Sequence, residues 1–162
     1  IDIVIYKFDN ETGYIIDQTI SAELSPIATI DEQVFKLFDI DGDGISEIIR
    51  VSSGQVDVIY LDQDSKWVNK ADVIGNSGYA YYSFDLFYDE DISKSVMIIV
   101  QEEISTSEFY FAKYQFNSTY DLDQLASVEC PEDLIPTSIK IIENLVSTGQ
   151  KAILIGGRIV GS

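Results

Sequence analysis

Short apolar segments, each followed by a polar turn, recur along the chain in the same order. One kind of segment pair spans residues 35–51, 84–99 and 139–155, and a second kind spans residues 3–14, 56–67 and 110–120. Their apolar residues alternate with polar ones or are β-branched, which is typical of β-strands. Tyrosines at positions 6, 60 and 114 recur at intervals of 54 residues in the second kind. The sequence therefore predicts an all-β domain in which an inner and an outer hairpin alternate.

An inner and an outer hairpin together make a unit of four strands. Repeats of roughly 40–50 residues with four strands are typical of β-propeller blades. The 162 residues divide into a partial unit at 1–30, units at 31–80 and 81–130, and a partial unit at 131–162. A closed propeller needs about four blades or more, and this chain holds about three. Either this chain is part of a longer propeller, which we favour, or the repeats pack in some other all-β arrangement. We expect a longer chain that closes the ring, or self-association through the terminal strand edges, above all through residues 153–160.

One segment admits a second interpretation. Ile139, Ile142 and Val146 would share one face of a helix over residues 138–148. The alignment with the other inner hairpins favours strand, loop and strand over the same residues.

A short acidic segment between two predicted strands carries the sharpest chemical signal. Residues 39–47, here called the acidic loop, have carboxylates at loop positions 1, 3, 5 and 9 and a glycine, Gly44, at position 6. Ca²⁺ takes six to eight oxygen ligands, and a glycine at position 6 permits the sharp turn around the ion. The pattern predicts a Ca²⁺ site whose ligands are Asp39, Asp41, Asp43, the backbone carbonyl of Ile45, and Glu47, with water completing the shell.

The flanks of the acidic loop distinguish it from an EF-hand. An EF-hand needs a bidentate glutamate at position 12 and a helix on each side, but position 12 is Arg50 and both flanks are predicted strands. The loop resembles instead the FG-GAP or VCBS repeat of integrin-type β-propellers. That family has the pattern Asp-x-Asp-x-Asp-Gly-x-x-Asp with apolar residues at positions 2, 7 and 10, which are Ile40, Ile45 and Ile48 here. Glu47 replaces the final aspartate. The resemblance implies a calcium-binding propeller blade of an extracellular or cell-surface protein.

The second inner hairpin keeps only part of the acidic pattern. Asp89 and Asp91 align with Asp41 and Asp43, whereas Phe87 and Ser95 stand at the first and last ligand positions. We therefore expect one Ca²⁺ site, and a second ion at residues 89–91 stays an open alternative.

Charge and composition limit the function. The net charge of −18 disfavours nucleic acid and anionic membrane surfaces as partners. The chain contains no histidine, so it lacks the commonest general base and the commonest transition-metal ligand. Its one cysteine, Cys130, cannot form an internal disulfide. No apolar run approaches the roughly 20 residues that span a bilayer. We expect no enzymatic activity and no membrane insertion within this chain.

Two functions remain. The first is a non-catalytic, calcium-stabilised module that binds a protein or a glycan. It would be extracellular or lie on the cell surface, for example as part of a bacterial lipoprotein. The second is a fragment of a propeller enzyme that acts on polysaccharide. Residues 79–88 are rich in aromatic side chains, which are predicted either to form a sugar-binding platform or to be a strand with one buried face.

Overall fold

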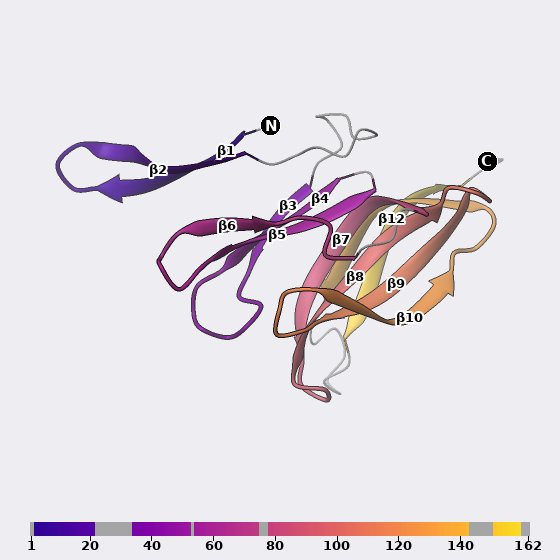
Figure 1. Cartoon of the computed structure of the whole chain (residues 1–162). Coiled ribbons are helices and arrows are strands. Elements are labelled where there is room, and N and C mark those ends of the chain that lie inside the picture. The colour runs from indigo at the N-terminus through magenta and orange to yellow at the C-terminus, as the bar shows by residue number, and fades with distance from the viewer. Residues whose placement is uncertain (1, 22–33, 53, 75–77, 143–150, 160–162) are drawn as a thin grey trace.

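The computed structural model describes residues 2–21, 34–52, 54–74, 78–142 and 151–159 (Figure 1). Within these ranges the chain forms twelve β-strands and no helix, so the all-β prediction is confirmed. The strands are β1 (Asp2–Asp9), β2 (Gly13–Ser21), β3 (Val34–Phe38), β4 (Glu47–Ser52), β5 (Gln55–Leu61), β6 (Trp67–Lys70), β7 (Tyr79–Asp89), β8 (Lys94–Glu103), β9 (Glu108–Phe116), β10 (Leu122–Glu129), β11 (Leu134–Ile142) and β12 (Ala152–Ile159).

The strands form four antiparallel sheets in chain order. Strands β3 to β6 make the first sheet and β7 to β10 the second sheet, and in both each strand pairs with the next one in sequence. The N-terminal hairpin (β1–β2) and the C-terminal hairpin (β11–β12) are two-stranded sheets. All six predicted hairpins are therefore present. Residues 138–142 lie in β11, so the helix alternative is wrong there, and residues 143–148 lie outside the described ranges.

From the first sheet to the C-terminal hairpin, consecutive sheets pack face against face. We call the face toward the next sheet the front and the face toward the preceding sheet the back. The front of the first sheet and the back of the second sheet share one apolar core, in which Ile49 and Val58 meet Phe84 and Ile99. The front of the second sheet packs against β11 in another core. Because side chains alternate along a strand, β8 in the middle of the second sheet is buried on both faces, whereas β10 at its edge is mostly exposed.

This arrangement corrects two details of the sequence interpretation. Tyr60 lies on the front of the first sheet and stacks on Tyr120, whereas Tyr114 lies on the back of the second sheet, in the core between the two sheets. The interval of 54 residues therefore does not mark equivalent positions. The aromatic segment forms β7 and contributes to both cores, through Phe84 on one face and Phe87 on the other, while Tyr82 and Tyr88 are exposed.

Three ionic side chains tie together the first strands of three sheets. Asp85 of β7 accepts from the ammonium groups of Lys36 of β3 at 2.6 Å and Lys140 of β11 at 3.0 Å. The Asp85 side chain is only 6% exposed. Burial raises its pKa, but hydrogen bonds from Lys36, the Ile141 N–H and Lys140 outweigh burial, and the pKa lies below its ordinary value.

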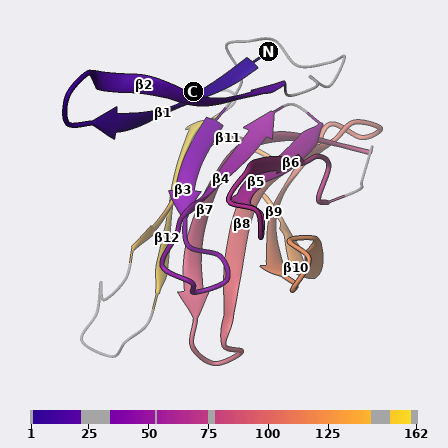
Figure 2. The same cartoon turned by 60° about the vertical axis from the view of Figure 1, so that its left-hand side comes forward.

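The sheets nevertheless do not close on one another. In Figure 1 the N-terminal hairpin lies at one end of the row of sheets, and Figure 2 shows from a second direction that no ring is formed. In the described part of the chain, the edge strands of the four sheets, β1 and β12 among them, pair with no strand of another sheet. The described residues thus do not form the closed arrangement of a propeller.

Candidate metal centre

The acidic loop connects β3 to β4 at one end of the first sheet. Phe38 and Glu47 face each other as the last pair of the hairpin, and the eight residues between them form the turn. Gly42 and Gly44 have φ angles of 80° and 87°, a region that L side chains rarely adopt. These two glycines allow the backbone to fold tightly between the strands.

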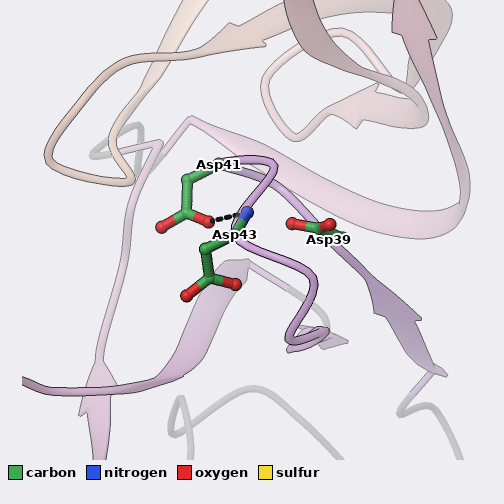
Figure 3. Close-up of side chains that lie close together, drawn as sticks. All are labelled: Asp39, Asp41 and Asp43. Atoms are coloured by element: carbon green, nitrogen blue, oxygen red, sulfur yellow. Dashed lines mark hydrogen bonds between the residues drawn. The ribbon is translucent and has the colours of Figure 1, made fainter.

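The turn brings three aspartates together (Figure 3). The carboxylate oxygens that Asp39, Asp41 and Asp43 can offer all lie within 4.8 Å of one another. Sequence reasoning had assigned these three side chains to one site, and the structure places them in one cluster. Carboxylate oxygens at this density suit a hard cation such as Ca²⁺.

Backbone N–H groups hold the Asp39 carboxylate. Its Oδ1 accepts from the Gly42 N–H at 2.7 Å, and its Oδ2 accepts from the Gly44 N–H at 3.0 Å. The side chain of the first loop residue thus organises the two glycines that follow.

Shorter-range hydrogen bonds orient the other two aspartates. Asp41 Oδ1 accepts from the Asp43 N–H at 3.1 Å, the contact drawn in Figure 3, and Asp43 Oδ1 accepts from the Ile45 N–H at 2.7 Å. Among the described residues, no lysine or arginine forms a salt bridge with any of the three. Like charges this close repel one another, and a bound cation would relieve that repulsion.

Glu47 differs from the three aspartates in its surroundings. It is 2% exposed, and its Oε2 accepts from the Ile40 N–H at 2.7 Å. Burial raises the pKa of Glu47 to about 7, and the charges of Asp41 and Asp43 add to the rise. Glu47 does not belong to the group of three closely spaced carboxylates. Its role as a ligand, and that of the Ile45 carbonyl, stay predictions.

Two residues of the second sheet hold the acidic loop from outside. The Tyr120 hydroxyl donates to Asp41 Oδ2 at 2.7 Å, and the Ser95 hydroxyl donates to the Ile40 carbonyl at 2.6 Å. Burial and the hydrogen bond to Asp41 raise the pKa of Tyr120, so it is a protonated donor at neutral pH. Sequence reasoning missed both contacts, because they join residues 79 and 55 positions apart.

The corresponding turn of the second sheet carries its own counter-ion. Lys113 Nζ lies 2.8 Å from Asp89 Oδ2, and the hydrogen bond from this lysine lowers the pKa of Asp89. Within the described ranges, the acidic loop is the one place where three metal-ligating side chains come this close together.

A cavity of about 550 Å³ lies away from the acidic loop, between the β8–β9 turn and the start of β11. Its lining includes Glu102, Glu108, Phe109, Glu129, Cys130 and Glu132. Burial, followed by the charge of Glu129, raises the pKa of the Cys130 thiol to about 11, so this cysteine is a poor nucleophile at neutral pH. The lining combines acidic side chains with apolar ones such as Phe109, Leu134 and Ile135.

Comparison with known proteins identifies no relative. No protein-family model, no curated protein and no solved structure matches the chain. In the described part of the structure no helix is long and apolar enough to cross a bilayer. Proposals about function therefore rest on the residues and contacts of the chain itself.

Proposed function

We propose that this chain is a calcium-stabilised module of the β-propeller type that binds a protein or a glycan outside the cell or at its surface, without catalysis. The observation that supports it most directly is the cluster of three aspartate carboxylates in a loop that backbone N–H groups hold in shape. The ligands are Asp39, Asp41, Asp43, the Ile45 carbonyl and Glu47, with water completing the shell. Sites of this kind in extracellular modules bind Ca²⁺ with dissociation constants of roughly 10⁻⁴–10⁻³ M.

The packing of the sheets supports blades as the structural unit. Both complete sheets are four-stranded meanders, and the front of each packs on the back of the next element. Their first strands meet at the Lys36–Asp85–Lys140 network, as innermost strands around a common axis do. Calcium at the β3–β4 turn would stabilise one blade and, through Tyr120 and Ser95, its contact with the next.

Side-chain chemistry supports a binding role over catalysis. The chain has no histidine, and its one thiol is buried. One observation favours the alternative, a propeller enzyme acting on polysaccharide: the acidic cavity places several glutamates around one hollow. Hydrolysis of a polysaccharide that is lost in Glu108→Gln or Glu129→Gln would establish that alternative.

Calorimetry tests the calcium site. Ca²⁺ titrated into chelator-treated protein should give a one-site isotherm, and Asp41→Ala should abolish it. Asp91→Ala is the matched control, because Asp91 occupies the corresponding turn of the second sheet and should leave the isotherm unchanged. No heat at millimolar Ca²⁺ would overturn the proposal. Glycan and surface-protein arrays probed with and without Ca²⁺ then identify the ligand.

A further inference from the structure

The cavity between the β8–β9 turn and the start of β11 is lined by four carboxylates and no basic side chain. Its volume of about 550 Å³ lies within the range of small-molecule sites, roughly 300–1,000 Å³. The four carboxylates belong to Glu102, Glu108, Glu129 and Glu132. Among the described residues, no lysine or arginine forms a salt bridge with any of them. A concave wall with charges of one sign raises the local concentration of ions of the opposite sign, so this cavity attracts cations.

Neutral donors hold two of these carboxylates in place. The Tyr82 hydroxyl donates to Glu102 Oε2, and the Tyr110 hydroxyl donates to Glu108 Oε2 at 2.9 Å. The hydrogen bond to Glu108, followed by burial and the charges of nearby glutamates, raises the pKa of Tyr110 to about 12. Tyr110 is therefore a protonated, uncharged donor at neutral pH. An ionised carboxylate has about four acceptor positions, so each of these two glutamates keeps its charge and can accept further hydrogen bonds.

The less exposed part of the lining is apolar. Phe109, Leu134 and Ile135 are half-buried, whereas the glutamates other than Glu102 are exposed. The ring of Phe109 lies beside the ring of Tyr82, with centroids 5.6 Å apart and planes inclined at 55°. Aromatic rings attract cations, and the aliphatic side chains suit a hydrocarbon. The lining thus fits a ligand that has a hydrocarbon body and positive charges.

A buried thiol faces the same cavity. Cys130 lines it and is 6% exposed, and within the described part of the chain no hydrogen bond is formed by its Sγ atom. Buried polar groups normally have a partner, so an unpartnered one that lines a cavity points to a polar ligand. Sulfur is a weak acceptor, and an ammonium N–H could donate to it.

The spacing of the carboxylates favours an extended cation over a metal ion. In the described ranges, three carboxylates approach one another closely enough to share a metal ion at Asp39, Asp41 and Asp43, and no three of the cavity glutamates do so. Carboxylates that are spread around a cavity instead match ammonium groups that are separated along a hydrocarbon chain.

We propose that this cavity binds alkylammonium ligands, with ammonium groups at the Glu102, Glu108 and Glu129 carboxylates and the hydrocarbon chain against Phe109 and Leu134. Two sources supply this chemistry, a free polyamine and the lysine side chains of a partner protein. The site is independent of the proposed calcium centre, because no residue of the acidic loop lines the cavity.

Calorimetry with spermine tests the proposal. Spermine titrated into chelator-treated protein should give a saturable isotherm. Glu102→Gln and Glu129→Gln should each lower the affinity about tenfold or more, because each removes a charged acceptor, and the double variant should abolish saturable binding. Glu90→Gln is the matched control: it removes the same charge from an exposed position in the β7–β8 turn, at the other end of the second sheet, and should leave the isotherm unchanged.

Two further measurements exclude misfolding and binding at the acidic loop. Glu129 is exposed, and glutamine keeps the shape of glutamate, so circular dichroism should show both single variants folded. Asp41→Ala should lose Ca²⁺ binding and keep the spermine isotherm, whereas Glu129→Gln should keep the Ca²⁺ isotherm. Failure of the alkylammonium site and failure of the calcium site are therefore distinguishable.

A tetralysine peptide with blocked termini carries the same number of charges as spermine and distinguishes the two sources. Tighter binding of the peptide would indicate the lysines of a partner protein, and tighter binding of spermine a free polyamine. The proposal is overturned if neither gives saturable heat at millimolar concentration, or if Glu90→Gln and Glu129→Gln weaken binding equally. Displacement of spermine by an equal concentration of Mg²⁺ charge would also overturn it, since the overall charge of the chain would then account for the binding. Saturable binding of a neutral oligosaccharide in place of spermine would assign the cavity to sugars instead.

Discussion

Tyr120 and Asp41 are joined across two sheets: the phenol hydroxyl of Tyr120, in the β9–β10 turn of the second sheet, donates to the carboxylate of Asp41 in the acidic loop at 2.7 Å. The Tyr120 ring also stacks on Tyr60 of the first sheet, with centroids 4.6 Å apart. The loop that carries the metal ligands is therefore also part of the interface between two sheets. An ion bound there should therefore stabilise that interface.

Tyr120→Phe should weaken Ca²⁺ binding while keeping the fold. The phenylalanine ring preserves the stacking on Tyr60, but Asp41 loses a donor that orients it. A hydrogen bond to a charged group contributes about 1.5–3 kcal/mol, so we expect a loss of about tenfold or more in affinity. Calorimetry measures it. Tyr110→Phe, which removes an exposed hydrogen bond to Glu108 far from the loop, is the control. Equal affinity in both variants would show that Tyr120 does not position the site.

Ca²⁺ should raise the melting temperature of the wild-type chain. An ion that binds only the folded state stabilises it by mass action, by about 2.7 kcal/mol at 100 times the dissociation constant. Differential scanning calorimetry in Ca²⁺ and in chelator measures the rise, and Asp41→Ala should remove it. If neither the chelator nor the substitution changes the melting temperature, the ion has no structural role.

Glu47→Gln should affect the stability of the calcium-free protein and that of the calcium-bound protein differently. An amide oxygen can still accept from the Ile40 N–H, and the substitution removes a buried negative charge beside Asp41 and Asp43. In chelator we therefore expect stability equal to or above that of the wild type. In Ca²⁺ the variant should gain less, with affinity about tenfold lower, because a charged ligand is missing. Urea unfolding with and without Ca²⁺ shows whether the two curves diverge in this way.

Asp85 should make the stability fall at acid pH. Its pKa in the folded chain lies below the ordinary value of 3.8, so the folded state favours the ionised form. The stabilisation is fully present above the pKa of the unfolded chain and is lost as the pH falls through the folded value. Asp85→Asn should cost about 2 kcal/mol at pH 7, since Lys36 and Lys140 lose their partner. It should also flatten the decline below about pH 4. Chemical unfolding at pH 7 and at pH 3 checks both effects.

The sequence by itself determined the strands, the hairpins and the aspartate cluster, because these depend on local chemistry. Alternating apolar residues define a strand, and the spacing of Asp39, Asp41 and Asp43 around Gly42 and Gly44 is enough to bring three carboxylates together. Those predictions needed no knowledge of which sheet lies beside which.

Only the tertiary structure decided which faces meet. An approximate repeat does not tell which side chains of a strand point to which face of its sheet, since a shift of one residue exchanges the two faces. The interval of 54 residues between Tyr60 and Tyr114 therefore predicted equivalent positions wrongly, although each tyrosine lies in a predicted strand. The contacts of Tyr120 and Ser95 with the acidic loop, and the pairing of Lys36 and Lys140 with Asp85, likewise arise from packing between sheets distant in sequence. Such packing depends on where whole sheets come to lie, and no local pattern encodes it.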